Sequence, residues 1–78
     1  YIASKGCGVC DVIFPRLTQL LESYPRLRGF KIELDQVPDI SGIFHVFSIP
    51  CVLLYIQGKE TVREARYIII ERLQEQLE

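Results

Sequence analysis

Lys5-Gly6-Cys7-Gly8-Val9-Cys10 is the segment from which the fold of this chain can be worked out. It lies where a short apolar run, Tyr1 to Ser4, gives way to a segment with helical periodicity. If the second segment is a helix, Cys7 falls in its first turn, with Cys10 one turn later on nearly the same side. Free N–H groups and the positive end of the helix dipole then face Cys7 and favour its thiolate, which attacks disulfides and binds metals.

The helix predicted from Cys7 onward has an apolar stripe at helical spacing, made of Ile13, Leu17, Leu20, Leu21 and Tyr24. Pro15 lies inside this pattern and should kink the helix, because it removes one backbone hydrogen bond. Pro25 disfavours helical geometry at Tyr24, and Gly29 supplies a stop.

The middle of the chain predicts a second strand and a short helix. Phe30 to Asp35 alternates apolar and charged residues, which is typical of a strand with one buried face near the edge of a sheet. A short helix should begin around Pro38, with an apolar side formed by Val37, Ile40, Phe44 and Phe47, and Ser48-Ile49-Pro50 interrupts it.

The last third predicts a hairpin and a final helix. Cys51 to Ile56 is a nearly continuous apolar run, as expected for a strand covered on both faces. Gly58-Lys59 turns the chain, and Glu60 to Arg66 reads as a charged, edge-like strand paired back onto it. An apolar stripe from Ile69 to Leu77 forms the last helix. The predicted order is therefore βα, βα, ββα, in one α/β domain over residues 1–78.

Composition and charge argue against several classes of partner. The 78 residues are 49% hydrophobic and 24% charged, as in a soluble globular domain, and the formal net charge is −1. That balance argues against nucleic acid or an anionic membrane as partner, and the apolar runs are too short to span a bilayer. Three cysteines, with no visible signal peptide, do not resemble a secreted disulfide scaffold. We therefore expect a cytoplasmic monomer.

Several motifs at fixed spacing resemble the thioredoxin family. An Ile49-Pro50 pair precedes the apolar strand and Gly58 follows eight residues later, Pro15 stands five residues after Cys10, and Lys31 stands nineteen before Pro50. The resemblance implies a thioredoxin-like fold: a minimal βαβ(α)ββα arrangement with a central mixed sheet, helices on both faces and a cis Ile49–Pro50 bond. The usual first strand and helix of the family have no counterpart in this sequence.

The function that the resemblance implies is thiol–disulfide exchange by a Cys7–Cys10 dithiol. Cys7 would attack a substrate disulfide, and Cys10 would resolve the mixed disulfide. The residues expected to contact substrate are Gly6, Gly8, Val9, Ile49 and Pro50. Expected partners are protein disulfides and a reductase or other thiol electron donor. No metal and no cofactor beyond the redox-active disulfide are expected.

Three positions depart from the family pattern. Gly6 replaces the usual Trp before the first cysteine, which removes an aromatic docking surface. Val9 replaces the Pro of the motif, in a dipeptide that tunes the reduction potential in the family. Tyr1 stands six residues before Cys7, where the family has a buried acid, so the proton acceptor for Cys10 is unassigned.

Two other functions remain open from the sequence. Cys7, Cys10 and Cys51 could form a thiolate trio in a thioredoxin-like binding or metal-carrying module, although a buried Cys51 is more often a small apolar residue. The chain could also be a non-redox scaffold, which the intact cysteine pair disfavours. Lys31 is expected to be half-solvated and His45 to lie on the surface, whereas Tyr55 and Tyr67 are expected to pack.

Overall fold

The computed structural model describes residues 1–77 and contains one four-stranded mixed sheet with three helices. The strand order is β2-β1-β3-β4, in which β1 is parallel to β2 and antiparallel to β3, and β3 is antiparallel to β4. The elements in chain order are β1 (Ile2–Ala3), α1 (Gly8–Leu21), β2 (Ile32–Glu33), α2 (Ile40–Phe44), β3 (Cys51–Ile56), β4 (Lys59–Ala65) and α3 (Ile70–Leu77). The order and the mixed sheet predicted from the sequence are confirmed.

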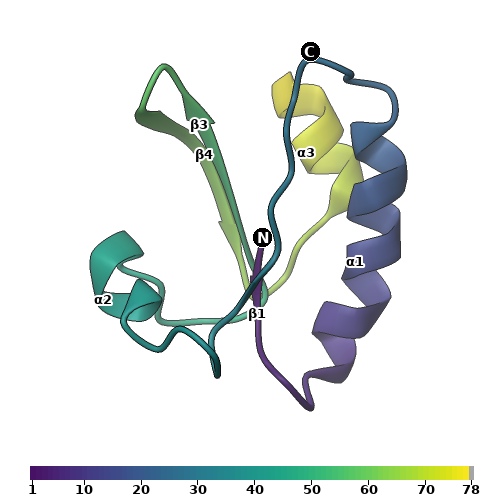
Figure 1. Ribbon diagram of the computed structural model, residues 1–78. Helices are drawn as coiled ribbons and strands as arrows, with labels where there is room; N and C mark the ends of the chain where they lie inside the picture. Colours follow the sequence, from purple (N-terminus) through teal and green to yellow (C-terminus); the bar gives the residue numbers. More distant parts are fainter. Residues whose placement is uncertain (78) are drawn as a thin grey trace.

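Helices cover both faces of the sheet, and each face has its own apolar core. α1 and α3 lie together on one side and α2 lies on the other (Figure 1). The first core contains Ile13, Leu17, Val62, Ile68, Ile70 and Leu73, with Val52 and Leu54 of β3 packed against it. The second contains Ile2, Val46 and Cys51, with side chains of α2 packed against it. Successive residues of β3 thus face opposite cores, as strand geometry requires.

The pairing of β1 brings together the strand ends that lead to the cysteine pair. Ile2 is paired with Ile32 of β2 and with Cys51 of β3, so the strand is held from both sides. Because β3 is antiparallel to both of its neighbours, the carboxyl ends of β1 and β4 lie beside the start of β3. These strand ends form the sheet edge at which the site lies. Cys7 follows β1 at this edge after a three-residue connection.

The ends of several elements differ from the sequence prediction. α1 ends at Leu21, short of Tyr24, and the chain continues in tight turns in which the N–H groups of residues 22–24 bond carbonyls three positions back. Gly29 is not a helix stop. It lets the chain pass the helix end, since a Cβ there would lie 2.6 Å from Leu21 Cδ1. The predicted strand Phe30–Asp35 is reduced to the two residues of β2, which is an outer strand of the sheet, as expected, and pairs with β1.

β3 is not covered on both faces along its whole length, contrary to the prediction. Cys51 is fully buried, but burial decreases along the strand, and Tyr55 and Ile56 are 42% and 52% exposed. Figure 1 shows the reason: the tip of the β3–β4 hairpin extends beyond α2 and stands apart from α3. Tyr67, expected to pack, is 77% exposed.

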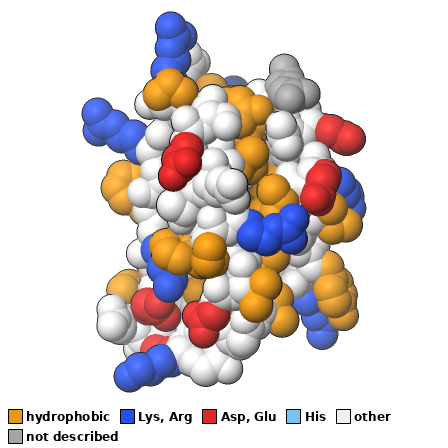
Figure 2. Space-filling view, turned by 90° about the vertical axis from the view of Figure 1, so that its right-hand side faces the viewer, with side chains coloured by type: hydrophobic (Ala, Val, Ile, Leu, Met, Phe, Trp, Pro, Cys, Tyr) orange, Lys and Arg blue, Asp and Glu red, His pale blue; other side chains and the backbone are white. Residues whose placement is uncertain are grey.

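The surface over α1 and α3 carries no large area of one charge. Apolar side chains alternate there with basic and acidic ones (Figure 2). Val12, exposed on α1, is among the apolar residues of the chain's surface. Within residues 1–77, no helix is long and apolar enough to cross a membrane.

Neighbouring residues of α1 provide a test of the first core. Ile13 is buried and Val12 is 66% exposed. We expect Ile13→Val to lower the free energy of unfolding by about 0.5–1.5 kcal/mol, because it removes a buried methylene group. Val12→Ala removes more atoms but should change the free energy by less than about 0.5 kcal/mol, because the side chain is in solvent. Equilibrium denaturant unfolding measures both. Equal losses would contradict the described packing.

Candidate functional site

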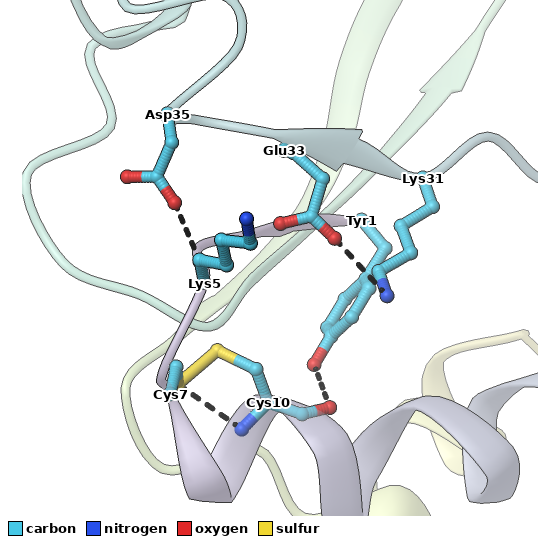
Figure 3. Close-up of a disulfide and its surroundings, with 7 residues drawn as sticks. All are labelled: Tyr1, Lys5, Cys7, Cys10, Lys31, Glu33 and Asp35. Carbon is cyan, nitrogen blue, oxygen red and sulfur yellow. Dashed lines mark hydrogen bonds and ion pairs between the residues drawn. A yellow bond between two sulfur atoms is a disulfide. The ribbon is translucent and has the colours of Figure 1, made fainter.

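Cys7 and Cys10 are joined by a disulfide at the amino-terminal end of α1 (Figure 3). Cys7 is the N-cap residue, with extended backbone geometry, and α1 begins at the next residue, Gly8. Its Sγ accepts a hydrogen bond from the Cys10 N–H at 3.1 Å, and the two Cα atoms are 5.2 Å apart. Cys7 therefore stands just outside the first turn, where the unpaired N–H groups of a helix favour negative charge on its sulfur.

The two cysteines differ in accessibility. Cys7 is partly exposed, whereas Cys10 is 2% exposed and lies behind it in the first turn of α1. Gly8 and Val9 between them are exposed, and so is Gly6, which has a φ of 78°. This positive φ is readily adopted by glycine and lets the chain turn from β1 into the helix. An incoming group can thus reach Cys7 before Cys10.

Tyr1 contacts the backbone of Cys10, an interaction that the sequence analysis did not predict. Its hydroxyl donates a hydrogen bond to the Cys10 carbonyl at 2.7 Å, and its ring stacks on Phe14 with centroids 5.8 Å apart. Burial, together with the nearby carboxylates of Asp11 and Glu33, raises the pKa of the Tyr1 hydroxyl to about 12. At neutral pH this group is a hydrogen-bond donor and cannot take a proton from Cys10. The position of Tyr1, six residues before Cys7, is the sequence signal that could have revealed the contact.

Lys31 and Glu33 form the other polar pair near the disulfide. Lys31 Nζ is 3.3 Å from Glu33 Oε1 and 4.4 Å from the centroid of the Phe14 ring. About a third of each of the two side chains is exposed, so Lys31 is half-solvated as predicted. Figure 3 shows both side chains on the Tyr1 side of the site, while Asp35 accepts a hydrogen bond from the Lys5 N–H at 2.6 Å. The bond from Lys5 to Asp35 joins the chain after β1 to the chain after β2, and Lys31 joins the β2 segment to α1 through Phe14.

The Ile49–Pro50 peptide bond is cis, as the resemblance implied, and Pro50 is buried. Since Cys51 is the partner of Ile2, extending this antiparallel register by one residue places Pro50 opposite Ala3. On its other side the Pro50 carbonyl accepts a hydrogen bond from the Arg66 N–H at 2.7 Å. The loop that contains Ile49 and Pro50 thus lies at the sheet edge from which the chain leads to Cys7.

Cys51 does not join the other two cysteines in a common site. Its side chain is fully buried in the core on the α2 face, with Ile2 and Val46, whereas Cys10 is a residue of α1 on the opposite face. Burial raises the pKa of the Cys51 thiol, and the charge of Arg63 opposes this shift only in part. Among the described residues, no three His, Cys, Asp or Glu side chains are grouped so that they could hold a metal ion. The thiolate trio is therefore not favoured.

Two apolar hollows lie away from the disulfide. The larger has a volume of about 820 Å³ and the smaller about 380 Å³, and neither is lined by Cys7, Cys10 or Pro50. The larger is bounded by α1, the segment around Phe30 and the middle of the sheet. The cysteine pair therefore faces the surface near a loop and not an enclosed pocket, an arrangement that suits a macromolecular disulfide better than a small ligand.

Comparison with known proteins gives a consistent result. A family model described as Thioredoxin matches residues 1–77. The chain is 39% identical over 77 residues to thioredoxin-like protein YdfQ of Bacillus subtilis, covering 99% of this chain and 69% of that protein. It is 32% identical over 57 residues to thioredoxin-1 of Saccharomyces cerevisiae, covering 73% of this chain and 55% of the yeast protein. The structure of thioredoxin 1 from Thermosipho africanus superposes with a TM-score of 0.90 at 21% identity, covering 99% of this chain and 85% of the other, and so shows the same fold.

The raised pKa of Tyr1 predicts an unusual alkaline titration. At pH 11 a hydroxyl with a pKa of about 12 is only about one tenth ionised, whereas an ordinary tyrosine is about nine tenths ionised. Removing the Tyr1 hydroxyl in Tyr1→Phe should therefore hardly change the tyrosinate absorbance of the folded protein at pH 11. Free tyrosine, titrated in the same buffer, is the reference and should be about nine tenths ionised at that pH.

The same shift predicts how stability depends on pH. The folded-state pKa of Tyr1 lies above the ordinary value of 10, so its contribution is complete below pH 10 and is lost as the pH rises toward 12. The stability difference between wild type and Tyr1→Phe should shrink over that window. A constant difference, or a Tyr1 absorbance that appears near pH 10, would contradict a partly buried hydroxyl that acts as a hydrogen-bond donor.

Proposed function

Because this chain belongs to the thioredoxin family and is a thiol–disulfide oxidoreductase, we propose that Cys7 is its attacking thiol and Cys10 its resolving thiol. The observation that carries this assignment is the unequal placement of the two sulfurs. Cys7 is accessible at the helix N-cap and accepts the Cys10 N–H, whereas Cys10 is buried behind it. Both the helix end and the hydrogen bond favour a thiolate at Cys7.

The reaction follows from this arrangement. In the reduced protein the Cys7 thiolate attacks one sulfur of a substrate disulfide, and the bond to the other sulfur breaks, which releases that sulfur as a thiolate. The Cys10 thiolate then attacks Cys7 Sγ, forms the Cys7–Cys10 disulfide and releases the second substrate sulfur. The substrate gains two electrons and the protein loses two. The Tyr1 hydroxyl remains protonated throughout, so Cys10 loses its proton to another group.

The substrates we propose are protein disulfides, held in extended form against the exposed backbone around the pair. Gly6, Gly8 and Val9 are exposed on one side, and the Ile49–Pro50 loop lies at the same sheet edge. Small residues before and within the motif leave room for a substrate chain to approach Cys7. A reductase or another thiol donor would restore the dithiol after each cycle.

Further assignments follow from the family and remain proposals. Residues 1–78 would form a single domain that acts as a monomer in the cytoplasm, with the Cys7–Cys10 disulfide as its redox group and no other cofactor. The chain spans 69% of YdfQ and about half of the yeast thioredoxins it matches. The substrates and partners named here are therefore proposed by analogy with these longer proteins.

The order of attack can be tested by trapping. Cys10→Ser should accumulate mixed disulfides with protein substrates, because Cys7 attacks but nothing resolves the intermediate. Cys7→Ser should accumulate none, because both remaining cysteines, Cys10 and Cys51, are buried. Non-reducing electrophoresis followed by mass spectrometry of the bands measures both. If the two variants trap equally, or neither traps, the assignment is wrong.

Cys51 should be dispensable for turnover. It lies in the core on the α2 face, away from α1, so Cys51→Ala should reduce a protein disulfide at the wild-type rate. The stability cost should be about 0.5–1.5 kcal/mol, as for other small deletions in a core. Activity and denaturant unfolding are measured on the same preparation. Loss of activity at full stability, or a metal ion lost with the side chain, would favour the thiolate trio instead.

A further inference from the structure

We propose that Arg66 is a specificity-determining residue that selects protein disulfides carrying a carboxylate next to the attacked cysteine. This inference rests on the proposed function of Cys7 and Cys10. It concerns which substrates the site prefers and adds no step to the reaction.

Arg66 lies at the sheet edge where the substrate would bind. It directly follows β4, whose carboxyl end lies beside the start of β3, and its N–H donates to the Pro50 carbonyl at 2.7 Å. The same edge contains the end of β1, from which the chain reaches Cys7 after three residues. Arg66 is thus fixed by its backbone to the loop against which we place the substrate.

The backbone at Arg66 has a conformation that does not favour arginine. Its φ is 70°, in the left-handed region where glycine is the usual residue. Residues other than glycine held in this region tend to occur at functional sites, where the side chain is needed for more than folding. An exposed position with a positive φ would accept glycine more readily than arginine. The presence of arginine therefore points to a role for its side chain.

The guanidinium of Arg66 is free to bind an incoming anion. Four ion pairs join the described residues, and they use Arg16, Lys31, Arg63 and Arg72 but not Arg66. Glu64, the nearest acid along β4, is only 13% exposed and faces Arg72 at 3.9 Å. The Arg66 side chain is exposed and extends along the Tyr67 ring, with Cζ 5.9 Å from the ring centroid.

Tyr67 makes the pair suitable for docking. Its ring is 77% exposed, so it contributes apolar contact surface beside the charge of Arg66. An aromatic ring under a guanidinium limits the orientations of both groups and leaves the hydrogen-bonding edge of the arginine for a carboxylate. This exposed aromatic ring is present in a chain that has Gly6 in place of an aromatic residue before Cys7.

Acidic groups on the other side of the disulfide restrict where the substrate carboxylate can lie. Asp11 is exposed in the first turn of α1, and Asp35 follows β2 and accepts the Lys5 N–H. Both would repel a carboxylate placed near them. The exposed Lys5 adds a positive charge on that side, so the two acids make it less attractive to a carboxylate than the β4 side without excluding one.

The test uses two synthetic disulfide-linked peptides that differ only in having Glu or Gln on both sides of each cysteine. The KM and kcat for reduction are measured for wild type, Arg66→Gln, Arg66→Lys and Arg28→Gln, at low and high ionic strength. Arg28 is the matched control because it is also exposed and lies before β2. It is therefore at the amino ends of β1 and β2, away from the edge that leads to Cys7. Wild type should prefer the Glu peptide about two- to fivefold in kcat/KM at low salt, mainly through KM, as expected for one exposed ion pair.

The variants separate recognition from structure. Arg66→Gln should abolish the preference, Arg66→Lys should retain part of it, and Arg28→Gln should leave it unchanged. High salt should weaken it in wild type. Arg66→Gly should also lose the preference while unfolding at higher denaturant concentration, because glycine relieves the positive φ. Equal use of both peptides by wild type, an undiminished preference in Arg66→Gln, or a less stable Arg66→Gly would overturn the proposal. If wild type and all variants reduce neither peptide, the proposed function itself fails.

Discussion

The pairing of β1 with a strand on each side is the constraint on which the rest of the structure depends. β1 is only two residues long, yet Ile2 and Ala3 are almost completely buried and Ile2 is paired with both Ile32 and Cys51. Pairing with β2 positions the acidic and basic side chains next to the site. Pairing with β3 sets the Ile49–Pro50 loop beside the chain that leads to Cys7. A short central strand can do this because its hydrogen bonds are protected from water on both faces.

The two ends of the first helical turn have opposite electrostatic character. At Cys7, the helix amino terminus and the Cys10 N–H favour a negative sulfur at the surface. Behind Cys10, the Tyr1 hydroxyl is a neutral donor packed on Phe14, and Glu33, one of the carboxylates near that hydroxyl, is paired with Lys31. One sulfur is thus prepared for attack and the other is enclosed. This asymmetry is a property of the surroundings, since the two residues are chemically identical.

Much of the fold and the centre of the site could be predicted because the information is local. Helical periodicity from Ile13 onward, the continuous apolar run after Pro50 and the turn at Gly58 each reflect contacts within a few residues. The spacing of Cys7 and Cys10 likewise allows a disulfide across one helical turn, which the resemblance to the thioredoxin family implied and the structure contains. The errors concern the extent of elements. β2 is reduced to two residues and the end of β3 is exposed, because strand length depends on partners and covering helices far along the chain.

By itself, then, the sequence determined the order of elements, the family resemblance and the identity of the redox pair, all of which are set by short-range pattern and spacing. Only the tertiary structure decided which groups surround that pair. The hydrogen bond from Tyr1 to Cys10 and that from Arg66 to Pro50 join residues 9 and 16 positions apart, and Cys51 lies on the sheet face opposite α1. Such contacts follow from strand register, and register is settled by the cooperative burial of two cores and not by any local signal.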